Sequence, residues 1–80
     1  MKLPRDLSGE QVAKALCRSW GYRQVHQVGC HVILETETPS HHRLSIPNHH
    51  ILRLGTLNSI LRSVADIKKI EKDILLKTIS

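Results

Sequence analysis

The stretch that decides the fold is residues 22–47, YRQVHQVGCHVILETETPSHHRLSIP. It contains three short segments of strand-like composition, YRQVHQV, HVILETE and HRLSIP. Gly29 and Pro39 punctuate the two connections, which are short enough for neighbouring strands to pair antiparallel. The stretch therefore predicts a three-stranded antiparallel sheet.

The second segment shows how this sheet is oriented. Val32 and Leu34 share one face, while His31, Ile33 and Glu35 share the other, because side chains alternate along a strand. The third segment alternates in the same way. One face is expected to be covered by helices and the other to be at least partly exposed to water.

A helix is predicted before the sheet, over about residues 9–20. Ser8 and Gln11 have the spacing of a capping box, and Gly21 stands where a left-handed residue would end the helix. Apolar residues recur at helical intervals and form one stripe. The stripe consists of Val12, Ala13, Leu16, Cys17 and Trp20, and we expect Cys17 to be a small buried hydrophobe within it.

After the sheet, a second helix is predicted from Gly55 and Thr56. Its stripe is Leu57, Ile60, Leu61 and Val64. The pattern breaks near residues 66–70 and resumes as a short C-terminal helix. The order α-β-β-β-α, with this added helix, predicts one α+β domain of two layers, residues 1–80. It matches the topology of the double-stranded RNA-binding domain, although topology alone does not indicate activity.

Composition and charge narrow the class of partner. The 80 residues carry a net charge of +5, which favours a polyanion such as nucleic acid. Trp20 and Tyr22 are the only aromatic residues, so contact through backbone and shape is expected rather than base stacking, with a core of Leu, Ile and Val around Trp20. The charged N-terminus lacks the apolar run of a signal peptide, so we expect a cytoplasmic protein with no membrane partner.

His31 is the candidate catalytic residue. A histidine can act as general acid or base near neutral pH, and a base that removes the 2′-OH proton of RNA permits cleavage without a metal. Gly29 allows close backbone approach to a phosphate, and His49 is a candidate to bind phosphate or support the site. On spacing alone, a solvated strand residue is the commoner role for His31.

Two other sets of residues have competing interpretations. Lys14 and Arg18 lie one helical turn apart, and such charge is usually a solvated helix face. The pairs His41-His42 and His49-His50 suggest zinc, but adjacent strand residues point to opposite faces. Ligands would have to come from separate elements, perhaps with Cys30, and no zinc-ligand spacing is present. No metal or other cofactor is therefore expected.

Several motifs together resemble the HicA (YcfA-like) mRNA interferase toxins over about residues 7–66. The matching stretches are SGEQVAKAL, WGYRQVHQVGCHVIL and SIPNHHILRLGTLNSILRS. Within them, Gly29-Cys30-His31 stands for a Gly-Ser-His motif, and Pro47-Asn48-His49 for Pro-x-His. The resemblance implies a double-stranded-RNA-binding-like fold, metal-free cleavage of mRNA, His31 as the catalytic residue, and neutralisation by a HicB-like antitoxin.

The resemblance also indicates which residues bind RNA and where this sequence departs from the family. Residues expected to bind RNA are Gly29, Cys30, Lys14, Arg18 and His49. Cys30 replaces the usual Ser and is a weaker hydrogen-bond donor, while His26 stands where Arg is common. The alternative function is therefore a weakened or inactive RNA-binding or partner-binding module. His49, His26 or water could supply the second proton transfer.

Overall fold

The computed structural model describes residues 6–79, and residues 1–5 and 80 of the predicted domain lie outside the described residues. The predicted α+β class and element order are confirmed, and α2 begins one residue before the predicted Gly55. The elements are α1 (Gly9–Ser19), β1 (Arg23–Val28), β2 (His31–Thr36), β3 (His42–Pro47), α2 (Leu54–Lys68) and α3 (Lys72–Ile79).

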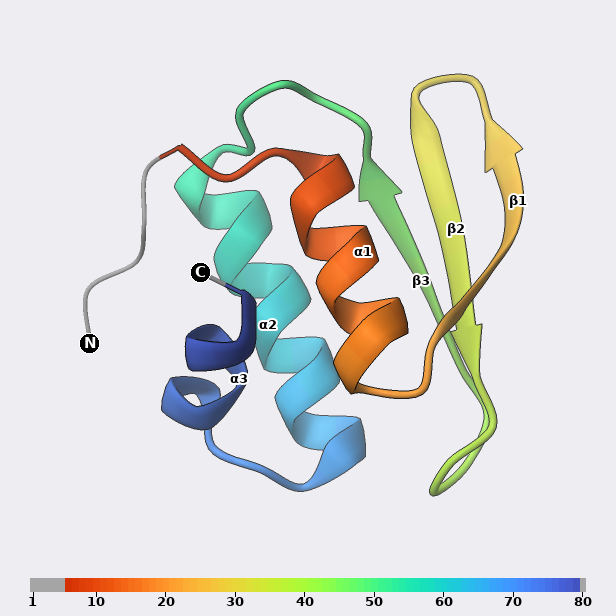
Figure 1. Ribbon diagram of the computed structural model, residues 1–80, viewed down its shortest axis with the longest axis vertical. Helices are drawn as coiled ribbons and strands as arrows, with labels where there is room; N and C mark the ends of the chain where they lie inside the picture. Colours follow the sequence, from red (N-terminus) through yellow and green to blue (C-terminus); the bar gives the residue numbers. More distant parts are fainter. Residues whose placement is uncertain (1–5, 80) are drawn as a thin grey trace.

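The sheet is antiparallel in the order β1-β2-β3, with β2 in the centre. Figure 1 shows all three helices on one side of it. We call this side the inner face; Val32 and Leu34 are buried there in the core. The opposite, outer face carries His31 and Ile33, and no described helix covers it. The expectation of one covered and one exposed face is therefore confirmed.

Helix α1 begins and ends as its sequence predicts. The Ser8 hydroxyl accepts from the Gln11 amide at 3.0 Å, and the Gln11 side chain accepts from the Ser8 amide at 2.8 Å. These two bonds satisfy amides that the first turn would otherwise leave unpaired. Gly21 follows the helix with φ +73°, the left-handed conformation that favours glycine.

The aromatic residues differ from the prediction of a core around Trp20. Trp20 is only partly buried at the end of α1, where its Nε1 donates to the Thr78 hydroxyl of α3 at 2.7 Å. Tyr22 is the aromatic residue that enters the core, with 4% of its surface exposed. The indole lies at the edge because it caps a helix end and its N–H needs a polar partner.

A polar cluster surrounds Tyr22 at the end of the sheet remote from His31. The Tyr22 hydroxyl and His42 Nδ1 lie 2.9 Å apart, and Lys68 Nζ lies 4.9 Å from the Tyr22 ring centroid. Lys68 also donates to the buried Thr36 hydroxyl at 3.0 Å. Burial raises the pKa of Tyr22 to about 12. Burial, followed by the charges of Lys68 and His41, lowers the pKa of His42.

The lowered pKa of His42 makes the stability of the fold depend on pH. Because the pKa of His42 is lower in the folded chain, the unfolded chain takes up a proton more readily. The stability that this difference contributes is complete above the ordinary histidine pKa of about 6.5. It is lost as pH falls through the pKa of His42 in the folded chain. We expect His42→Gln to flatten the fall in unfolding free energy between about pH 8 and pH 5 in urea titrations. The exposed His50→Gln control should keep the wild-type slope; equal slopes in all three proteins would contradict the assignment.

Candidate functional site

The β1–β2 turn presents His31 on the exposed side of the sheet. Gly29 has φ +57°, and it forms with Cys30 the two-residue connection between the strands. His31 is the first residue of β2 and is exposed; it lies opposite Val28 of β1 and Pro47 of β3. The turn therefore holds an accessible imidazole beside backbone that a bulky ligand can approach closely.

The segment after β3 is fixed beside this turn. The Asn48 amide donates to the Cys30 carbonyl, and the Gly9 amide donates to the His49 carbonyl at 3.0 Å. His49 thus lies at the same end of the molecule as Cys30. Figure 1 shows the β1–β2 turn and this segment at one end of the fold. His49 itself lines a hollow of about 600 Å³ at the start of α1, together with Ser8 and Gln11.

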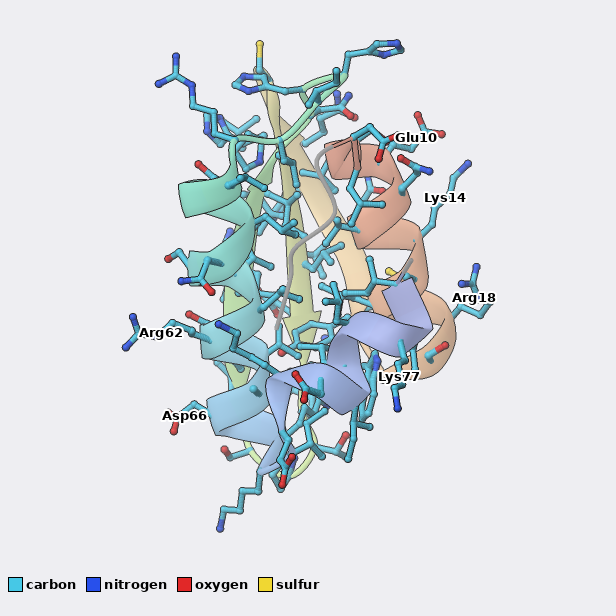
Figure 2. All side chains as sticks on the ribbon, turned by 90° about the vertical axis from the view of Figure 1, so that its left-hand side faces the viewer. Glu10, Lys14, Arg18, Arg62, Asp66 and Lys77 are labelled. Atoms are coloured by element: carbon cyan, nitrogen blue, oxygen red, sulfur yellow. The ribbon has the colours of Figure 1, made fainter. Side chains whose placement is uncertain are left out.

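Lys14 and Arg18 occupy a different surface. They line a groove of about 550 Å³ between α1 and the inner face, whose strand side includes Gln24, Gln27 and Val32. Figure 2 shows both side chains projecting from the same edge of α1. Lys14 is paired with Glu10 at 2.8 Å, and that pairing lowers the pKa of Glu10. The sheet separates this groove from His31, so the predicted RNA-binding residues fall on two faces.

Cys17 corrects the prediction of a buried thiol. It is exposed and lines the same groove. The reason is that the groove beside it is open, with the polar Gln24 and Gln27 of the edge strand β1 next to Val32, so the cysteine stays exposed. Partial burial raises the pKa of Cys17, against a smaller lowering by a hydrogen bond with the Gln24 backbone.

Within residues 6–79, one cluster of side chains could hold a metal ion such as zinc. Ligand atoms of Glu35, Glu37 and His41 lie within 4.8 Å of one another. However, Arg23 pairs with Glu35 and Glu37 at 3.8 and 3.6 Å, and Arg43 pairs with Glu35 at 3.7 Å. These guanidinium groups already supply the positive charge that a cation would bring. The cluster lies at the opposite end of β2 from Cys30 and His31.

Sequence reasoning did not place His26 beside His31. A β-bulge between Gln24 and His26 changes the pairing of β1 with β2. Gln24 lies opposite the core residue Leu34, and His26 lies opposite Ile33, whose side chain faces outward. Alternation counted back from Val28, which pairs with His31, puts His26 on the outer face, and the bulge lies on the other side of His26 from the turn. The two-residue turn of Gly29 and Cys30 is the sequence signal that could have placed His26 there.

Comparison with known proteins identifies one family. The family model described as "HicA toxin of bacterial toxin-antitoxin" matches residues 9–65, which is most of the chain. The match includes α1, the whole sheet and the greater part of α2. Neither the curated proteins nor the solved structures give a match. Within the described residues, no helix has both the length and the apolar character needed to cross a membrane.

Proposed function

This chain belongs to the HicA family of toxins of bacterial toxin–antitoxin systems, and on that premise we propose that it cleaves mRNA without a metal ion. The observation that carries the proposal is the exposed His31 beside the positive-φ Gly29, on the uncovered outer face. Cleavage of mRNA in the cytoplasm would arrest translation, which accounts for toxicity.

The proposed chemistry uses the substrate's own nucleophile. Neutral His31 accepts the proton of a ribose 2′-OH, and the 2′-oxygen then attacks the adjacent phosphorus. Backbone amides around Gly29 and Cys30 are available to donate to phosphate oxygens. The products are a 2′,3′-cyclic phosphate and a 5′-hydroxyl.

An antitoxin partner follows from the family, and we propose that it is a HicB-like protein covering the outer face. Val28, 62% exposed, lies directly opposite His31 and offers apolar area for such a contact. A partner seated there would exclude RNA from His31.

The test of the proposed function is cleavage of single-stranded RNA by purified protein in excess EDTA. We expect fragments that end in 2′,3′-cyclic phosphate, at a rate that added Mg²⁺ does not raise. RNA that is bound with a steep salt dependence but stays intact would instead favour the binding module, for which the thiol at Cys30 is the supporting observation.

A further inference from the structure

We infer that His26 is the second proton-transfer group of this site, donating a proton to the leaving 5′-oxygen while His31 accepts the proton of the 2′-OH. The inference rests on the proposed function, because it completes the reaction assigned to His31. It follows from the position of the two histidines on one uncovered face of the sheet.

The strand register makes the two histidines cross-strand neighbours. His31 lies opposite Val28, and His26 is two residues from Val28 on the same strand and lies opposite Ile33. His26 and His31 are therefore diagonal cross-strand neighbours, whose Cα atoms are typically about 7–8 Å apart. Both residues are exposed. A phosphodiester can lie between two imidazoles at this separation.

The two-residue turn of Gly29 and Cys30 is what creates this pair. It pairs Val28 with His31, and regular alternation back from Val28 puts His26 on the same outer face. The bulge at Val25 lies beyond His26 and leaves this part of the register unchanged. Ile33 lies opposite His26 and two residues from His31 on β2, and it is only 8% exposed, although it is not part of the described core cluster. It therefore provides a buried apolar position next to both histidines.

His26 is also free to act, whereas other candidates are engaged or lie elsewhere. No hydrogen bond or ion pair of the His26 side chain occurs among residues 6–79. Glu35, its other diagonal neighbour on β2, is paired with Arg23 and Arg43. His49 is at the same end of the molecule, but it is not on the outer face of the sheet and lines the hollow at the start of α1.

The geometry suits an in-line displacement, in which the entering and leaving oxygens lie on opposite sides of phosphorus. The bond from the 2′-oxygen to phosphorus forms as the bond from phosphorus to the 5′-oxygen breaks. The 2′-OH proton passes to His31, and the imidazolium of His26 gives its proton to the 5′-oxygen. Proton exchange with water then restores both residues.

A substrate with a sulfur atom in place of the bridging 5′-oxygen tests this role, because a thiolate leaves without protonation. We expect His26→Gln to slow cleavage of ordinary RNA about 100-fold. On the 5′-thio substrate the same variant should cleave within about threefold of wild type, since a thiol of pKa about 8.5 needs no general acid. His41→Gln, an exposed histidine at the other end of the sheet, should match wild type on both substrates.

The outcomes separate this inference from the proposed function. Equal losses on both substrates would indicate a role in binding or positioning, and no loss on either would remove His26 from the reaction; each result overturns the inference. His31→Ala should lose activity on both substrates, because the 2′-OH still needs a base. Wild-type protein that cleaves neither substrate would overturn the proposed function and this inference with it.

Discussion

Replacing Gly9 with alanine is expected to lower the free energy of unfolding by about 3 kcal/mol or more, the upper part of the overpacking range. A Cβ at Gly9 would lie 1.9 Å from the Pro47 carbonyl oxygen and 2.9 Å from its carbon. Both are backbone atoms, so relief requires α1 to move away from the end of β3. Alanine's better helix propensity, worth at most about 1 kcal/mol, is the smaller effect.

Gly55→Ala is the matched control for this prediction. Gly55 also lies in the first turn of a helix, but a Cβ there meets nothing within 4 Å. We expect its unfolding free energy, measured by urea denaturation, to equal or slightly exceed that of wild type. If Gly9→Ala were as stable as Gly55→Ala, the close contact between α1 and Pro47 would not exist in solution.

Replacing His31 with alanine is expected to reduce RNA cleavage by about 10³–10⁴-fold, the upper part of the range for general acid–base catalysis. The side chain is exposed at the start of β2, so its removal leaves the core intact. The unfolding free energy should therefore change by no more than about 0.5 kcal/mol. Loss of activity without loss of stability is the signature of a catalytic role.

The measurement is initial-rate cleavage of a labelled RNA in EDTA, together with growth after induced expression. His41→Ala serves as the control, because His41 is equally an exposed histidine but lies at the far end of the sheet beside Glu37. We expect the control to arrest growth as wild type does. Cleavage that survives in His31→Ala would refute the assignment of His31.

Features governed by neighbours in sequence were predicted well. The capping box of Ser8 and Gln11, the left-handed Gly21 and the Gly29 turn all depend on a few adjacent residues, and all are present. The break between α2 and α3 is also confirmed, and it occurs at Lys69, which has φ +57°. Local backbone preferences decide such features before any packing occurs.

Features governed by distant partners were predicted less well. Cys17 fits the apolar stripe of α1, yet it is exposed because the groove beside it is open. Trp20 is large and apolar like a core residue, yet it is only partly buried, and its N–H donates to the Thr78 hydroxyl of α3. Helical periodicity indicates which face points inward but not how far the sheet beneath it extends.

For the candidate site, the sequence by itself pointed to His31: its place after a glycine turn and the family-like motifs downstream make it the predicted catalytic residue. The tertiary structure alone decided which residues share its face. It places Lys14 and Arg18 in a groove on the inner-face side of the sheet, away from His31, and it makes His26 a cross-strand neighbour of His31. The physical reason is that a shared face depends on pairing and packing between distant segments: Val28 pairs with His31 across the turn, and α1 packs against the opposite face of the sheet.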